Sequence, residues 1–103
     1  MMKLAKDVIK PKESDIKREI RAYLKMRGIW HYNQWQGQFS HPGVSDICGI
    51  YKGKPLYIEV KVPNYRTNTK TFFNEMKFQT QARDSGAIAF MATSVSDVME
   101  KLL

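Results

Sequence analysis

The chain holds a single cysteine, Cys48, among its 103 residues. One thiol cannot form an intramolecular disulfide, so a reducing, intracellular compartment is the default expectation. No stretch approaches the roughly 20 apolar residues that a membrane span needs. The N-terminal stretch alternates charged and apolar residues and lacks the apolar core of a signal peptide. We therefore expect a cytoplasmic protein that does not contact a membrane.

Histidine is almost as scarce, since the chain has only two. Their positions and that of the cysteine do not follow the spacing of zinc ligands, and no Gly-rich phosphate loop or Ser-His-Asp pattern is present. We expect Cys48 to be a small buried hydrophobe and His31 to be half-buried in a strand. These residue types therefore predict neither a zinc site nor a nucleophilic triad.

Acidic residues are also in the minority, with 10 Asp and Glu against 17 Lys and Arg, for a net charge of +7. This balance favours a polyanionic partner such as nucleic acid, although a solvated basic surface would have the same composition. Six Lys and Arg fall within residues 52–77, against only Glu59 and Glu75. The length and the 43% of apolar residues predict one domain over residues 1–103 with one modest core.

Apolar periodicity predicts the element order α-β-β-β-α-β-α. Apolar residues at helical spacing indicate a helix over 13–27 that ends at Gly28. Strict alternation indicates a strand over 56–62, which follows a hairpin turn at residues 52–55. The other expected elements are strands over 29–35, 44–51 and 87–93, a loop over 36–43, a helix over 72–85, and a last short helix capped by Ser94 or Ser96. This order predicts an α/β fold with a mixed sheet flanked by helices.

Three polar residues occupy positions where apolar ones would be expected. Asp46 interrupts an apolar strand, whereas Glu59 and Lys61 lie two residues apart and so share one face of the alternating strand. The Gly53 turn folds the second strand back on the first, which brings Asp46 and Glu59 towards each other. Taken alone, Asp46 could be an ordinary turn residue, and Glu59 and Lys61 could be an ion pair on the surface of a strand.

Two carboxylates that converge in a half-buried site repel each other unless a cation lies between them. Carboxylate oxygens suit hard cations such as Mg²⁺ or Mn²⁺. Such an ion can activate water and neutralise charge on a phosphate, and Lys61 adds a fixed positive charge on the same face. The combination predicts a metal-dependent phosphodiester hydrolase with Asp46, Glu59 and Lys61 as catalytic residues.

The segments Gly43-Val44-Ser45-Asp46 and Glu59-Val60-Lys61 resemble the G-x-x-D and E-x-K motifs of the PD-(D/E)XK nuclease superfamily. Over nearly its whole length the chain is similar to the stand-alone VRR-Nuc domains of that superfamily, with serine where proline often precedes the aspartate. The resemblance implies a Mg²⁺- or Mn²⁺-dependent endonuclease that acts as a homodimer on branched DNA such as Holliday junctions. It also implies that the main-chain carbonyl of Val60 binds the metal, and it is compatible with a phage or prophage origin.

The resemblance further implies a glutamate from the first helix, for which Glu13 and Glu19 are the candidates. Helical geometry places Glu13 within the apolar stripe and Glu19 off its edge, so we expect Glu13 to join Asp46 and Glu59 as a catalytic and metal-binding carboxylate. The glutamine that the family carries in the second helix falls at Glu75, a departure that leaves the roles of Glu75, Gln79 and Gln81 open.

Several residues outside the motifs are candidates for DNA contact. Arg66 and Lys70 belong to a basic loop directly after Lys61, and His41 precedes the Gly43 segment; Lys52 and Lys54 lie in the hairpin turn. Trp30 and Trp35 could be core, interface or base-stacking residues.

A homodimer is also expected from the chain itself. The large apolar residues near the loops exceed what so small a core readily hides, namely Trp30, Trp35, Phe39, Phe72 and Phe73. The competing hypotheses are a non-catalytic nucleic-acid-binding module and an accessory subunit of a DNA repair or restriction complex, neither of which requires a metal.

Overall fold

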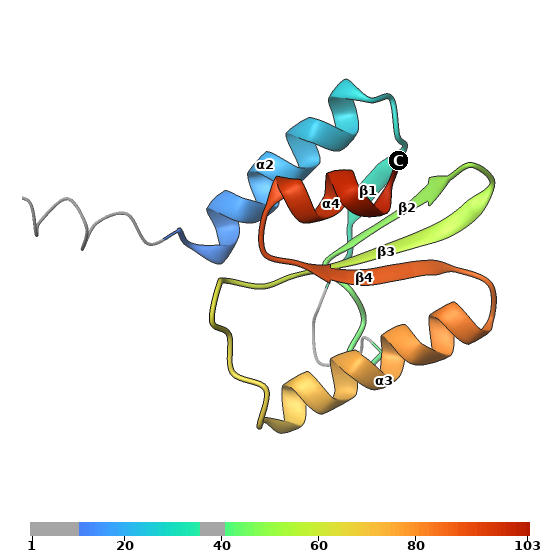
Figure 1. Cartoon of the computed structure of the whole chain (residues 1–103). Coiled ribbons are helices and arrows are strands. Elements are labelled where there is room, and N and C mark those ends of the chain that lie inside the picture. Colours follow the sequence, from blue (N-terminus) through green and yellow to red (C-terminus); the bar gives the residue numbers. More distant parts are fainter. Residues whose placement is uncertain (1–10, 36–40) are drawn as a thin grey trace, which may run out of the picture.

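The computed structural model describes residues 11–35 and 41–103, so Phe39 lies outside the described residues. The described part is an α/β fold in the expected order α-β-β-β-α-β-α (Figure 1). The elements are α2 (Glu13–Met26), β1 (His31–Asn33), β2 (Ile47–Tyr51), β3 (Lys54–Val60), α3 (Lys70–Asp84), β4 (Ile88–Ala92) and α4 (Val95–Lys101).

The four strands form one mixed sheet in the order β1-β2-β3-β4. The first three strands are antiparallel, and β3 pairs in parallel with β4. A parallel pair needs a crossover connection, which α3 provides. Lys52 and Gly53 both have positive φ, at 50° and 80°, as a tight hairpin turn between β2 and β3 requires.

Helices cover both faces of the sheet, with α2 and α4 on one face and α3 on the other (Figure 1). The apolar core lies between the sheet and the α2–α4 layer, because Leu56, Ile58 and Val60 of β3 are fully buried together with Ile20 and Leu24 of α2. The alternate residues of β3, Tyr57 and Glu59, face α3. The expected alternation along this strand is therefore confirmed.

The strand expected over 29–35 is shorter in the structure, where β1 covers only His31–Asn33. Gly28, at φ 71°, donates its N–H to the Lys25 carbonyl, and Ile29 donates to the Leu24 carbonyl. This pair of bonds is a Schellman motif that ends α2. Ile29 thus belongs to the helix cap.

The strand expected over 44–51 begins only at Ile47, because the segment before it packs against α3 and leaves the ladder. The second helix starts at Lys70, two residues earlier than expected, since the Thr69 side chain caps it by accepting a hydrogen bond from the Phe72 N–H. Of the two serines considered for the last helix, Ser94 is the cap.

Within residues 11–35 and 41–103, no helix combines the length and the apolar character that crossing a membrane would require.

Candidate active site

Three buried carboxylates and one lysine meet where β3 ends. Asp46 precedes β2, Glu59 belongs to β3, and Glu75 comes from the first half of α3; their exposed fractions are 6%, 4% and 9%. Lys61 follows β3 directly and is half-buried. We call Asp46, Glu59, Glu75 and Lys61 the carboxylate cluster. The antiparallel register brings together its first two members, because Ile47 lies opposite Ile58.

Short polar contacts connect the cluster. The Lys61 Nζ lies 2.5 Å from Glu75 Oε1 and 3.7 Å from Glu59 Oε2. The Val60 main-chain N–H donates to Asp46 Oδ2 at 2.8 Å, and the Lys17 Nζ lies 3.5 Å from Asp46 Oδ1. Asp46 is therefore fixed by the main chain of the strand that carries Glu59.

Burial has its largest electrostatic effect on Glu59. Loss of solvent, followed by the charges of Asp46 and Glu75, raises the pKa of Glu59 to about 10. The carboxyl group of Glu59 thus holds a proton at neutral pH. Its Oε1 is buried, and no described residue donates a hydrogen bond to it. A buried oxygen without a donor is a position where a cation would be favourable.

The donor set of the cluster fits a hard divalent cation, since it offers carboxylate oxygens whose mutual repulsion such an ion would relieve. Among the described residues, no group of three or more His, Cys, Asp and Glu side chains is already arranged as a metal site. Within the cluster, the Lys61 ammonium group contacts both Glu59 and Glu75.

Gly43 allows the segment that carries Asp46 to approach α3. Its φ is 77°, and a Cβ at this position would collide with the main-chain carbonyl of Asn74, the residue before Glu75. Only glycine adopts this φ readily and also leaves room for the Asn74 carbonyl. The glycine of the G-x-x-D motif therefore holds the Asp46 segment against the helix that supplies Glu75.

Replacing Gly43 by Ala is expected to lower the free energy of unfolding by about 2–4 kcal/mol, because a left-handed φ and a main-chain collision add up. Urea denaturation of the two proteins measures the difference. Gly53→Ala is the matched control, since Gly53 also has positive φ but has open space around its Cβ position. Equal losses in both variants would show that the contact with Asn74 does not matter.

The two helix glutamates differ in their relation to the cluster. Glu13 is exposed on the first turn of α2 and does not lie in the buried stripe as expected. It still belongs to the rim of the cluster, because partial burial, followed by the charge of Asp46, raises the pKa of Glu13. Glu19 is exposed on the same helix.

The predicted DNA-contacting residues fall into two groups. Arg66 is exposed on the connection from Lys61 to α3, and Lys70 is the exposed first residue of α3. His41 is also exposed, and the centre of its ring lies 5.7 Å from that of Phe78 on α3. The turn residues Lys52 and Lys54 lie at the opposite end of the β2–β3 hairpin from the cluster. There the Lys52 Nζ donates to the Leu103 carbonyl at 3.3 Å.

Sequence reasoning did not identify Lys17 and left Glu75 open. A signal for Glu75 was present, because Glu75 and Gln79 are four residues apart and form the buried stripe of α3. A helix that buries two polar residues against a sheet usually does so for a specific partner. Gln79 uses its side-chain N–H on the Phe90 carbonyl of β4, at 2.9 Å, and Glu75 pairs with Lys61.

No known family model, curated protein or solved structure matches the chain. The function is therefore inferred from the geometry of the carboxylate cluster and from the motifs that form it.

Proposed function

We propose that this protein is a Mg²⁺- or Mn²⁺-dependent DNA endonuclease with a PD-(D/E)XK core of the VRR-Nuc type. The observation that carries the proposal is the convergence of buried Asp46 and Glu59 from two adjacent strands beside Lys61. The net charge of +7 supports a phosphate-rich substrate.

Asp46, Glu59 and the main-chain carbonyl of Val60 would hold the divalent cation, with Glu13 approaching from the rim. The Val60 peptide lies at the cluster, since its N–H donates to Asp46 at 2.8 Å. When bound, the cation would supply positive charge that stabilises the phosphate during hydrolysis. Burial of Asp46 and Glu59 would keep water away from the bound cation and so strengthen its electrostatic effect.

Lys61 supplies the fixed positive charge of the site. Burial opposes its charge, but the effects led by the hydrogen bond and the charge of Glu75 outweigh burial and raise the pKa of Lys61. The ammonium group is therefore charged at neutral pH. In this position it would orient the attacking water or stabilise charge that develops on the phosphate. Glu75, where the family has glutamine, holds Lys61 in place.

Replacing Lys61 by Ala is expected to lower the cleavage rate of the saturated complex by about 10²–10³-fold, as for loss of one preorganised charge. DNA affinity should change little, because one lysine adds little to a contact with many phosphates. Single-turnover cleavage and equilibrium binding separate the two effects, and Lys101→Ala, at an exposed position on α4, is the control. If affinity falls while the saturated rate stays normal, Lys61 is a binding residue.

The basic loop suits DNA contact near the cut, because Arg66 and Lys70 lie directly after Lys61 and His41 lies against α3. We retain Lys52 and Lys54 only as contacts to a remote part of the DNA, since they lie at the far end of the hairpin. A substrate with several arms, such as a Holliday junction, has DNA on more than one side of so small a domain.

The experiment that tests the proposal compares a labelled four-way junction with a linear duplex of the same sequence, with and without Mg²⁺ or Mn²⁺. We expect cleavage only with the metals and faster cleavage of the junction. Binding without cleavage under every metal condition would contradict an endonuclease and leave a nucleic-acid-binding module.

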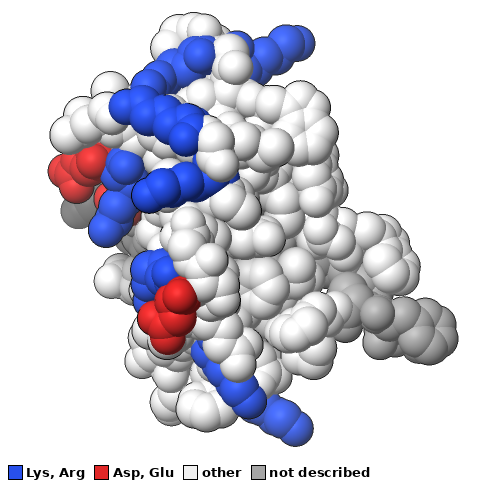
Figure 2. Space-filling view, turned by 90° about the vertical axis from the view of Figure 1, so that its right-hand side faces the viewer, with Lys and Arg blue, Asp and Glu red and all other residues white. Residues whose placement is uncertain are grey.

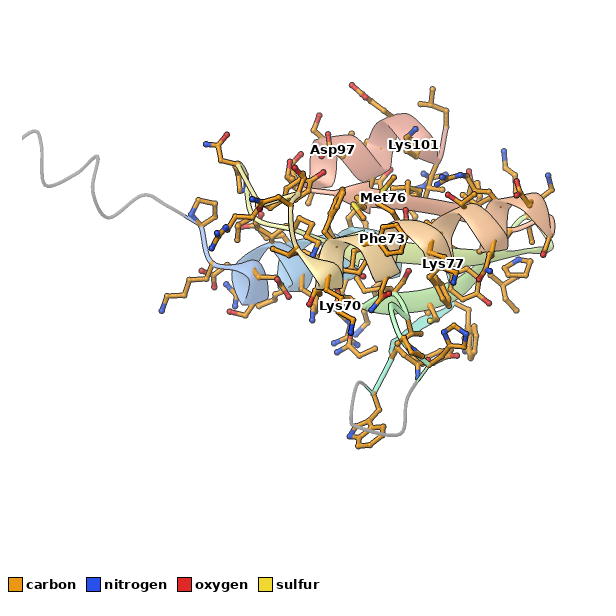
Figure 3. The ribbon with its side chains drawn as sticks, turned by 90° about the horizontal axis from the view of Figure 1, so that it is seen from below. Lys70, Phe73, Met76, Lys77, Asp97 and Lys101 are labelled. Atoms are coloured by element: carbon orange, nitrogen blue, oxygen red, sulfur yellow. The ribbon has the colours of Figure 1, made fainter. Side chains whose placement is uncertain are left out.

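We further propose that two copies associate through the outer face of α3. Phe73 is 66% exposed and Met76 is 39% exposed, and together with Lys77 they line a shallow apolar groove on this helix (Figure 3). Exposed apolar surface of this kind often marks an interface, and a two-fold dimer would present two active sites to paired strands.

Light scattering at micromolar concentration should therefore give twice the mass of one chain, and Phe73→Glu should give a monomer because it places a charge in the interface. The exposed substitution Thr80→Glu at the edge of the groove should have a smaller effect. A wild-type protein that remains at 12.0 kDa with and without DNA would contradict the dimer.

A further inference from the structure

Outside the carboxylate cluster, the outer face of α2 and the start of β1 enclose a groove of about 610 Å³. We call it the α2–β1 groove. Its lining combines cationic and aromatic side chains, namely Arg18, Arg21, Lys25, Trp30 and His31. Trp30, one of the two tryptophans of the chain, is 62% exposed, whereas tryptophan side chains are usually highly buried. The groove plays no part in the hydrolysis described above.

A row of cations connects this groove to the cluster. Lys17, Arg21 and Lys25 are four residues apart on α2, so they lie along one side of the helix at intervals of about 6 Å. The first member is already at the site, with its Nζ 3.5 Å from Asp46 Oδ1. The last two line the groove beside Trp30. The row therefore runs from the catalytic carboxylates to an exposed indole ring.

The main chain fixes Trp30 in position. Its carbonyl accepts a hydrogen bond from the Ile50 N–H at 3.1 Å. Gly49 packs so closely on that carbonyl that a Cβ at Gly49 would collide with it. The indole ring lies 5.4 Å from the ring of Tyr32. An exposed aromatic pair on a fixed main chain is preorganised for a flat ligand.

Trp30 also borders a second pocket of about 330 Å³ on the sheet face, which it shares with Tyr32, Ile50 and Tyr57 among others and whose lining has no Lys, Arg, Asp or Glu. The indole thus lies between a groove lined by cations and a pocket lined by uncharged residues. Figure 2 shows one side of the molecule, on which Lys and Arg side chains gather beside a broad surface of other residues.

We propose that the α2–β1 groove binds a single-stranded segment of nucleic acid, with its phosphates along Arg21 and Lys25 and a base stacked on Trp30. Single strands are bound by this combination, because cations track the phosphates and aromatic rings stack on the bases. A fully paired duplex keeps its bases stacked on one another and cannot offer one to Trp30. This inference rests on the proposed function and deepens it: the preferred substrate is DNA with an unpaired strand beside the cut.

The test measures the affinity of a dye-labelled short oligothymidine by fluorescence anisotropy in EDTA, where no metal-dependent cleavage occurs. Trp30→Ala should weaken binding by about tenfold or more, as for loss of one stacked base, and Trp30→Phe should recover part of it. Arg21→Ala with Lys25→Ala should weaken binding by a similar factor and reduce its salt dependence. Trp35→Ala is the matched control, because Trp35 is 67% exposed; Lys101→Ala, at an exposed position on α4, is the charge control. Both controls should bind as the wild type does.

Wild-type affinity in Trp30→Ala, or an equal loss in Trp35→Ala, would overturn the inference. So would displacement of the oligonucleotide by polyglutamate at equal charge, which would assign the groove to an acidic peptide. A dimer that Trp30→Ala converts to a monomer would assign the groove to a second copy of the chain. Failure of the endonuclease proposal would be a separate result. In that case the protein would not cleave DNA, but oligonucleotide binding in EDTA would still depend on Trp30.

Discussion

Replacing Glu59 by Gln is expected to raise the free energy of unfolding of the metal-free protein at pH 8, by at most about 5 kcal/mol. Burial and the neighbouring carboxylates raise the pKa of Glu59 from 4.5 to about 10. Between these two values the unfolded chain loses the Glu59 proton more readily than the folded chain does. Each pH unit in this window therefore lowers the free energy of unfolding of the wild type by at most about 1.4 kcal/mol. Gln has the shape of the protonated carboxyl group and is neutral at every pH.

Urea denaturation in EDTA between pH 4 and pH 9 measures this effect. At pH 4 both states carry the proton, so the two proteins should be nearly equally stable, and the advantage of Glu59→Gln should then grow with pH. Glu100→Gln, on the exposed face of α4, is the control and should show no growing advantage. Parallel pH profiles of the wild type and Glu59→Gln would contradict a shared, proton-holding cluster.

The same measurement with Mn²⁺ should reverse the order of stability. A ligand that binds only the folded state stabilises it in proportion to the logarithm of its concentration above the dissociation constant. Mn²⁺ should therefore stabilise the wild type and have little effect on Glu59→Gln, which has lost one anionic ligand.

Replacing Asp46 by Asn is expected to lower the single-turnover rate of DNA cleavage by about 10³-fold or more, because the site loses an anionic metal ligand. Asn is a better choice than Ala for this test. It retains a side-chain oxygen that can accept the Val60 N–H, which lies 2.8 Å from Asp46 Oδ2. Ala would leave this buried donor without a partner, at a cost of about 1–3 kcal/mol.

The control for Asp46→Asn is Asp84→Asn, the same change at an exposed position at the end of α3. It should cleave at the wild-type rate, and both variants should show the wild-type circular dichroism spectrum. Cleavage by Asp46→Asn within a few-fold of the wild type would remove Asp46 from the active site.

The element order and the Asp46–Glu59 pair could be predicted from sequence because their causes are local. Alternation along residues 56–62 places Glu59 on the opposite face from the core, and the Lys52-Gly53 turn fixes the register of the hairpin. A strand pattern and a tight turn are enough to bring two carboxylates on neighbouring strands together.

The roles of Glu75 and Lys17 depend on contacts between elements that are distant in the sequence. Glu75 reaches Lys61 only because α3 crosses the sheet between two parallel strands, and Lys17 reaches Asp46 from the opposite layer. Helix periodicity shows which residues share a face, but it does not show which end of the sheet that face meets. The start of β2 was missed for a similar reason, since the Gly43 contact with α3 is a tertiary feature. The start of β1 was missed because Ile29 belongs to the local cap of α2.

Closeness in sequence was misleading for the turn lysines. Lys54 is five residues from Glu59, but an extended strand of that length covers about 17 Å. The hairpin therefore places Lys52 and Lys54 at the opposite end of the sheet from the cluster, whereas Lys17, 29 residues before Asp46, contacts it.

Binding of Mn²⁺ to the purified protein tests the metal centre most directly, because it requires no choice of DNA substrate. Electron paramagnetic resonance of free Mn²⁺ measures the bound fraction for the wild type, for the double variant Asp46→Asn with Glu59→Gln, and for Asp84→Asn. We predict that the wild type and Asp84→Asn remove Mn²⁺ from solution and that the double variant does not. Equal Mn²⁺ binding by the double variant, or none by the wild type, would contradict a metal centre at Asp46 and Glu59.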